Sequence, residues 1–209
     1  MAVSRDHLLH WIASVQQIYA RGKQYLTDLD SAIGDADHGI NMDRGFTAVK
    51  MELDKSIPES IDCVLKTVAA ILINTVGGAS GPLYGTFFLR AAAACAGKIE
   101  LNVHDVVAMF EAGLDGIVQR GKAQQNDKTM VDAWAPAVSV MKQALQNGNS
   151  IKSILQQGAS AAKEGMKNTI PMQARKGRAS YLGERSIGHQ DPGATSSYWI
   201  LQQAADLWE

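Results

Sequence analysis

The sequence has few cysteines, no long apolar run and no excess of charge of either sign. Its two cysteines, Cys63 and Cys95, are too few for a disulfide scaffold and lack the spacing of a zinc site. The most apolar run, Val68 to Ile73, is far shorter than the roughly 20 residues that span a bilayer. The first residues hold no apolar segment behind a basic cluster, so we expect no secretion signal. A reducing, cytoplasmic setting without membrane contact is therefore expected.

The charge balance argues against a protein that binds nucleic acid directly. Lys and Arg number 20 against 21 Asp and Glu, which leaves a formal net charge of -1. A protein that grips the phosphates of DNA or RNA needs a broad basic face, and this composition does not supply one.

The hydrophobic residues follow a helical period along most of the chain. They make up 46% of the 209 residues, which is enough for a core and too much for a disordered chain. Leu8, Ile12, Val15 and Tyr19, for example, recur at steps of three and four residues behind a Ser4 cap. Similar patterns predict about eight helices and no strand. Because no linker divides the chain, residues 1–209 are predicted to form a single all-α domain.

Cap residues mark two of the helix starts. Ser56, followed by Pro58, predicts the start of the helix that contains residues 61–76. That helix is apolar on most sides, so we expect the other helices to surround it. Asn102, with Asp105 three residues later, predicts a second capped start.

Two connections lack any helical period. Residues 27–39 are crowded with Asp and Gly, and residues 168–193 are rich in Gly, Arg and Ser. Long irregular connections in a compact domain are usually functional or disordered. The second connection carries Tyr181, Leu182 and Ile187, which could dock onto the domain, so we predict a lid.

Three carboxylates, Asp30, Asp35 and Asp37, fall within the first connection, just before a helix. Packed together they repel one another, and a divalent cation removes that repulsion. Oxygen ligands without cysteine favour Mg²⁺ or Ca²⁺, and the ligand series of an EF-hand is absent. An Asp-rich turn without a metal explains these residues equally well.

A glycine-rich turn, Gly77-Gly78-Ala79-Ser80-Gly81-Pro82, leads into another predicted helix. Such a turn presents free backbone N–H groups and the positive end of the helix dipole to an anion. It lacks the Lys-Ser/Thr of a P-loop. Taken alone, it is better explained by close packing of helices, because glycine lets backbones approach.

The second connection carries four cations: Arg175, Lys176, Arg178 and Arg185. The planar fork of arginine suits phosphate oxygens, whereas Arg175 and Lys176 are interpreted as solvated surface residues. The polar turn from Gly121 to Met130 looks like an ordinary connection when taken alone. His38 and His189 each stand beside glycine or aspartate, and we expect them to hydrogen bond rather than to carry a phosphoryl group.

The four features together describe one kind of site. Three metal ligands, a glycine-rich helix start, a polar turn and an arginine lid are what a nucleoside diphosphate or triphosphate held through Mg²⁺ requires. Phosphoryl transfer at such a site depends on positioning and charge neutralisation and needs no covalent nucleophile.

These motifs closely resemble those of the nucleotide-binding L subunits of dihydroxyacetone kinase, over essentially the whole chain. The resemblance rests on Gly34 to Gly39, Gly77 to Pro82 and Met172 to Ala194. It implies an antiparallel eight-helix barrel with a nucleotide and two Mg²⁺ ions at one end. Asp30, Asp35 and Asp37 would bind the metal ions, and Arg178 would be catalytic. The residues implied to contact the nucleotide are His38, Gly39, Ile40, Asn41, Ala79, Ser80, Gly121, Met130, Arg178, Asp191, Pro192 and Gly193.

The family contains two versions, and the sequence favours one of them. In one version the domain is fused to its substrate-binding domain and uses free ATP. In the other it is a separate subunit that holds ADP, transiently ATP, and a phosphohistidine protein of the phosphoenolpyruvate phosphotransferase system rephosphorylates this nucleotide in place. The phosphoryl group then passes to dihydroxyacetone on the K subunit. Because the chain begins at its first helix and ends at Glu209, we expect the separate subunit.

Other features of the family are expectations of the same kind. They are a homodimer and contact with a transcriptional regulator. The alternative function, from a different class, is a nucleotide-sensing protein that transfers no phosphoryl group. One residue departs from the family pattern, because Asn126 stands where the polar turn usually has glycine. Asparagine tolerates a positive φ better than most residues, so the turn can survive.

Overall fold

A computed structural model describes residues 2–208 of the chain. Within this part, the apolar stripes form eight α-helices, and a 3₁₀ segment, η1, precedes the last of them. The elements are β1 (Val3–Ser4), α1 (Arg5–Ile33), α2 (His38–Lys55), α3 (Ile61–Thr75), α4 (Ser80–Ala94), β2 (Glu100–Leu101), α5 (Val103–Gly121), α6 (Val131–Gln146), α7 (Ile151–Asn168), η1 (Arg178–Ser186) and α8 (Pro192–Leu207). The all-α prediction is confirmed.

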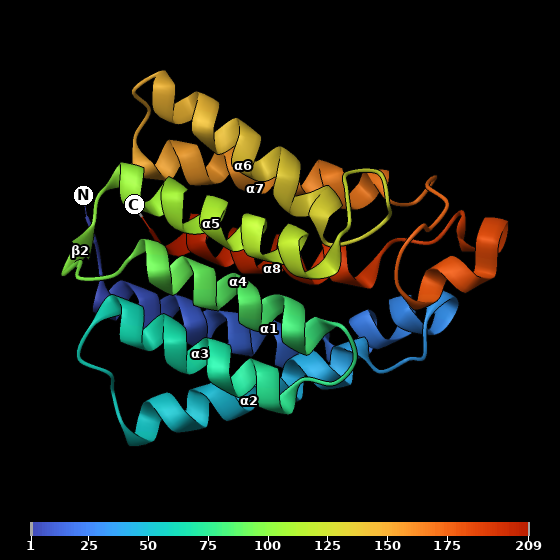
Figure 1. Ribbon diagram of the computed structural model, residues 1–209, viewed down its shortest axis with the longest axis horizontal. Helices are drawn as coiled ribbons and strands as arrows, with labels where there is room; N and C mark the ends of the chain where they lie inside the picture. The colour runs from blue at the N-terminus through green and yellow to red at the C-terminus, as the bar shows by residue number, and fades with distance from the viewer. Residues whose placement is uncertain (1, 209) are drawn as a thin grey trace.

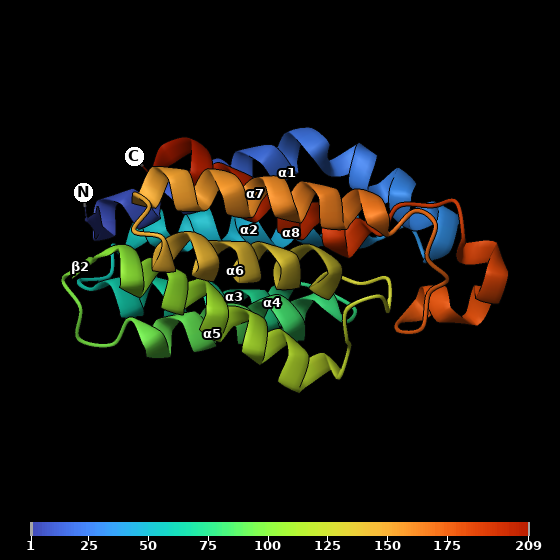
Figure 2. The ribbon, with the colours of Figure 1, turned by 90° about the horizontal axis from the view of Figure 1, so that it is seen from above.

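The helices form a closed antiparallel ring. Each helix packs against the next along the chain, and α8 returns to pack against α1 (Figures 1 and 2). Because successive helices alternate in direction, α2, α4, α6 and α8 all begin at the end drawn on the right of Figure 1. The segment η1 lies at that same end, and both chain termini lie at the other.

Aromatic side chains fill the middle of the ring. The Trp11 ring centroid lies 5.9 Å from those of Phe88 and Phe110 and 5.2 Å from that of Trp208. All four side chains are fully buried. Each such pair contributes about 0.5–1.5 kcal/mol beyond the burial of its area. This aromatic cluster forms part of the core inside the ring, near the end where α1 begins and α8 ends.

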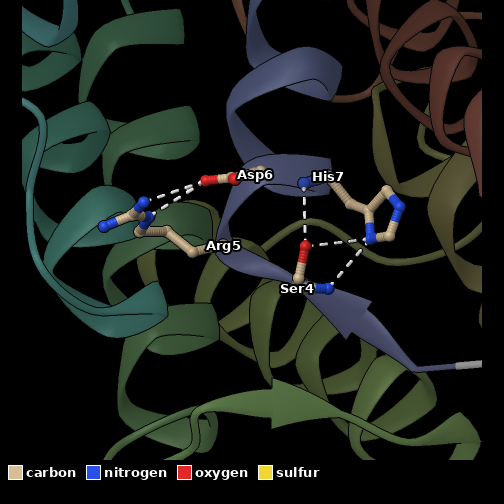
Figure 3. A network of polar contacts seen from close by, with 4 residues as sticks. All are labelled: Ser4, Arg5, Asp6 and His7. Atoms are coloured by element: carbon tan, nitrogen blue, oxygen red, sulfur yellow. Dashed lines mark hydrogen bonds and ion pairs between the residues drawn. The ribbon is translucent and has the colours of Figure 1, made fainter.

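Two of the three named caps form as predicted. Ser4 caps α1, because its hydroxyl accepts from the backbone N–H of His7 while its own N–H donates to His7 Nδ1 at 3.0 Å (Figure 3). Asn102 caps α5, and its own backbone N–H donates to the Asp105 carboxylate at 3.0 Å. The third prediction is wrong: Ser56 ends α2, and Ser60 caps α3 by accepting from the N–H of Cys63.

Three further expectations need correction. The strands β1 and β2 pair antiparallel, and at two residues each they are too short to show a period. Helix α3 is not surrounded, because its outer face is exposed and Ile73 is 46% accessible. Helix α1 continues to Ile33, so Asp30 lies in its last turn and not in a loop.

Candidate functional site

The three acidic residues converge where α1 ends and α2 begins. One carboxylate oxygen from each of Asp30, Asp35 and Asp37 lies within 4.8 Å of the other two. Asp30 is nearly buried, and its Oδ2 accepts from the backbone N–H groups of Asp37 at 2.8 Å and His38 at 3.1 Å. Its other oxygen and the two more exposed carboxylates make a set of hard oxygen donors. This set suits Mg²⁺.

A glycine makes this convergence possible. A Cβ atom at Gly34 would lie 2.0 Å from Asp30 Oδ1, closer than any real contact allows. The chain then turns through Ala36, which has a positive φ of 61°. The tight turn between α1 and α2 therefore depends on the absence of a side chain at position 34.

Helix N-termini face the same end of the ring. In the described part of the chain, α4 begins without a side-chain cap, so its first N–H groups remain available. The first N–H groups of α2 and α6 are already bound, because His38 N–H donates to Asp30 and Val131 N–H donates to Thr129. Helix α8 is capped by Asp191, whose Oδ2 accepts from the N–H of Ala194 at 2.7 Å. Free N–H groups and the positive ends of helix dipoles favour the binding of phosphate.

His38 ties two of these helix starts together. Its Nδ1 lies 3.1 Å from Ser80 Oγ on α4, and its Nε2 lies 2.9 Å from Ser196 Oγ on α8. Ser196 Oγ in turn lies 2.6 Å from the hydroxyl of the buried Tyr84. Burial lowers the pKa of His38 to about 4, so the ring is neutral at pH 7. With both ring nitrogens engaged, it suits the hydrogen-bonding role expected from the sequence.

A cleft runs along this end of the molecule. One part, of about 690 Å³, is lined by the three acidic residues, the glycine-rich turn and Arg178. The other part, of about 380 Å³, is lined by apolar side chains that include Leu83, Ile117 and Met130. Ala79 and Gly177 line both parts. The charged part suits phosphates, and the apolar part suits a flat base.

The segment η1 places a cation over the carboxylates. Arg178 Nη2 lies 3.0 Å from Asp35 Oδ2, and both side chains are largely exposed to solvent. An exposed pair of this kind contributes only about 0–1 kcal/mol to stability. Its consequence is therefore positional, because it holds the guanidinium group at the mouth of the charged part of the cleft.

The structure brings most of the predicted site residues to this cleft. Its walls include Asp30, Asp35, Asp37, His38, Ala79, Ser80, Gly121, Met130, Arg178, Asp191, Pro192 and Gly193. Gly39, Ile40 and Asn41 do not line it. Gly39 packs against α1, where a Cβ would lie 2.0 Å from the Lys23 carbonyl oxygen, and Asn41 accepts from Arg44 at 2.6 Å. These three residues instead build the first turn of α2.

Sequence reasoning missed the residues that build the polar turn beside the cleft. Asp132 accepts from the N–H groups of Thr129, at 2.7 Å, and of Asn126. Burial raises the pKa of this carboxyl group. Asn126 has a positive φ of 73°, which asparagine tolerates better than most residues, so the turn forms with asparagine at this position. The position of Asp132, six residues after Asn126, is the sequence signal that could have indicated this turn.

For Lys128 and Lys176, the sequence interpretation missed their positions relative to the cleft and the core. The side chain of Lys128 is 1% exposed, although its sequence context looks like an ordinary connection. Lys176, interpreted as a solvated surface residue, is exposed and also lines the cleft.

Comparison with known proteins agrees with the sequence motifs. A family model described as the DAK2 domain matches residues 32–206. The chain belongs to the DAK2 domain family. Among members of this family, it is 47% identical over 205 residues to "PEP-dependent dihydroxyacetone kinase, ADP-binding subunit DhaL" of Escherichia coli (strain K12), with 98% of each chain covered. It is 37% identical over 202 residues to "PTS-dependent dihydroxyacetone kinase, ADP-binding subunit DhaL" of Lactococcus lactis, with 97% of each covered.

A solved structure shares the fold of this DAK2 domain. The dihydroxyacetone kinase of C. freundii, crystallised with AMP-PNP and Mg²⁺, superposes with a TM-score of 0.74 at 21% identity. The match covers 99% of this chain and 34% of the solved chain, so this chain spans about a third of that protein. In residues 2–208, the helices are too short or too polar to cross a membrane.

Proposed function

We propose that this chain is the ADP-binding subunit of a dihydroxyacetone kinase. A phosphoryl group moves from a phosphohistidine protein of the phosphoenolpyruvate phosphotransferase system, by way of the bound nucleotide, to dihydroxyacetone on the K subunit. The product is dihydroxyacetone phosphate. The observation that carries this proposal is the meeting of Asp30, Asp35 and Asp37 with the uncapped start of α4 and Arg178 around one cleft.

Each part of the cleft has a task in this proposal. The three carboxylates hold two Mg²⁺ ions, which neutralise the charge of the phosphates when they are bound. The start of α4 orients the phosphate oxygens through backbone N–H groups. The apolar part, near Gly121 and Met130, receives the adenine. Arg178 contacts the group in transfer, because its planar fork can bond two of the equatorial oxygens.

The phosphotransferase-dependent version is favoured by the relatives. The two bacterial relatives, at 47% and 37% identity, carry names that specify PEP or the phosphotransferase system. The homodimer and the contact with a transcriptional regulator are further proposals, which light scattering and co-purification would test.

A reconstitution assay tests the proposal. The purified chain is mixed with Mg²⁺, ADP, a K subunit, dihydroxyacetone and a phosphohistidine donor, and dihydroxyacetone phosphate is measured with and without each component. We expect formation to require this chain, the donor and catalytic amounts of ADP. Sustained turnover on ATP without the donor would favour the ATP-dependent version, and ADP binding without any transfer would favour a sensing role.

A further inference from the structure

Lys128 is a buried cation between the polar turn and the lid, and the function proposed above does not use it. It is the third residue of the turn after Gln125 and has a positive φ of 62°. Its side chain is 1% exposed. A buried ammonium group is costly unless carbonyls or carboxylates satisfy its protons.

Backbone carbonyls satisfy those protons. Lys128 Nζ donates to the carbonyl oxygens of Thr169 at 2.7 Å, Met172 at 3.1 Å and His189 at 2.5 Å. Thr169 and Met172 lie where the chain enters residues 171–188, which we call the lid segment, and His189 lies where it leaves. One ammonium group therefore joins both ends of the lid segment to the turn.

Neighbouring hydrogen bonds close the same neck. The Gly188 N–H donates to the Ile170 carbonyl at 2.8 Å, and the Arg175 N–H donates to the Asp127 carbonyl at 3.0 Å. The ends of the lid segment are thus fixed to each other and to the residue that precedes Lys128. Arg178 stands within this segment, and Met130, two residues beyond Lys128, lines the apolar part of the cleft.

We propose that Lys128 is a positioning residue that clamps the neck of the lid segment, slows the departure of nucleotide and holds Arg178 over the phosphates. This inference rests on the proposed function. Lys128 acts through the backbone of the lid segment, to which its ammonium group donates. Its hydrogen bonds hold the polar turn, which leads to Met130 in the apolar part of the cleft, against the lid segment, which carries Arg178.

Lys128→Met tests this clamp, because methionine keeps much of the length and loses the charge and the donors. Dissociation of a fluorescent ADP analogue from the full chain with Mg²⁺ is followed after a chase with unlabelled ADP. We expect the rate to rise by about tenfold or more, since loss of charged hydrogen bonds weakens the closed state. Trypsin should also cut faster within residues 175–178 of the ADP-bound variant. Lys142→Met, at an exposed lysine paired with Glu111, is the matched control and should leave both rates unchanged.

A readout that simple destabilisation would not move is the rate at saturating nucleotide. In single-turnover transfer with all sites filled, Lys128→Met should still be slower, because Arg178 is no longer held. Lys128→Gln, which keeps a neutral donor, should fall between the wild type and methionine in both dissociation and transfer. Wild-type rates in both folded variants would overturn the clamp.

Two further outcomes separate the possible failures. If neither variant folds, hydrogen exchange of the ligand-free wild type decides: the Arg175 and Gly188 amides should exchange slowly, and rapid exchange would overturn the proposal. If the wild-type chain itself binds no ADP, the proposed function fails, whereas faster exchange of the Arg175 and Gly188 amides in Lys128→Met than in the wild type would still support the clamp.

Discussion

Asp30 has two roles in the structure, and replacing it with alanine measures both. Its carboxylate accepts two backbone N–H groups, from Asp37 and His38, and also faces the other two carboxylates. Hydrogen bonds to a charged group contribute about 1.5–3 kcal/mol each. Relief of repulsion among the carboxylates offsets part of their loss, so we expect Asp30→Ala to lower the free energy of unfolding by about 3 kcal/mol without ligand.

Asp35→Ala is the matched comparison. Asp35 makes one ion pair, to Arg178, and its side chain is 40% exposed, so its loss costs about 0–1 kcal/mol. In a chain of this length, 1 kcal/mol corresponds to roughly 2–4 °C in melting temperature. Ligand-free Asp30→Ala should therefore melt about 6–12 °C below the wild type, and Asp35→Ala within about 4 °C of it.

Mg²⁺ and ADP should widen the difference in melting temperature between the wild type and both variants. At about 100 times the dissociation constant, ligand adds about 2.7 kcal/mol to the stability of the wild type. Both variants should lose this gain, because phosphates cannot sit beside the cluster without the cations. Differential scanning calorimetry with and without Mg²⁺ and ADP measures all six values. An Asp30→Ala protein that melts like the wild type without ligand, or an Asp35→Ala protein that keeps the full ligand shift, would refute the reasoning.

Three other predictions follow from the same site and core. Arg178→Ala should retain ADP yet transfer the phosphoryl group roughly 10³-fold or more slowly in a single turnover. Arg178→Lys should be nearly as impaired, because lysine keeps the charge and loses the planar guanidinium fork. Near-normal transfer by either variant would show that Arg178 has only a structural role. Burial lowers the pKa of His38 from 6.5 to about 4, so the unfolded chain binds the proton first and the ligand-free protein should lose about 3 kcal/mol of stability as the pH falls from 6.5 to 4. His38→Gln should flatten that part of the pH profile of urea unfolding, and an unchanged slope would count against it. Iodoacetamide should label Cys63 in the native protein and leave Cys95 untouched, because burial raises the pKa of the Cys95 thiol to about 12; labelling of both before unfolding would contradict the packing.

The helices could be predicted because each one buries a stripe of apolar side chains, and the three- and four-residue spacing of that stripe is visible in the local sequence. Their ends were harder. Asp30 was assigned to a loop because Asp and Gly disfavour helices, yet α1 continues past it. The reason is a contact with residues outside the helix: the backbone N–H groups of Asp37 and His38 donate to the Asp30 carboxylate and hold Asp30 in the last turn of α1. Ser56 was predicted to cap the next helix because Pro58 follows it, but Pro58 lies in the connection between α2 and α3.

The residues of the candidate site also fall into those that could be predicted from the sequence and those that could not. The acidic and glycine-rich motifs are continuous, so their chemistry could be read before any fold was known. The clamp at Lys128 could not be predicted, because its acceptors are backbone carbonyls that lie 41, 44 and 61 residues further along the chain. Every residue has such a carbonyl, so no sequence pattern marks the ones that a lysine will find.

An even number of helices in a closed antiparallel ring has a practical consequence for work on this protein. The chain starts and finishes on the same side, and Trp208 Nε1 donates to the His7 carbonyl at 3.3 Å where the two ends meet. This meeting point is at the end of the ring away from η1 and the cleft (Figure 1). A fluorophore, affinity tag or surface tether attached to either terminus would therefore point away from incoming nucleotide. Immobilised kinetics and single-molecule measurements of the lid can be made without an attachment that obstructs its movement.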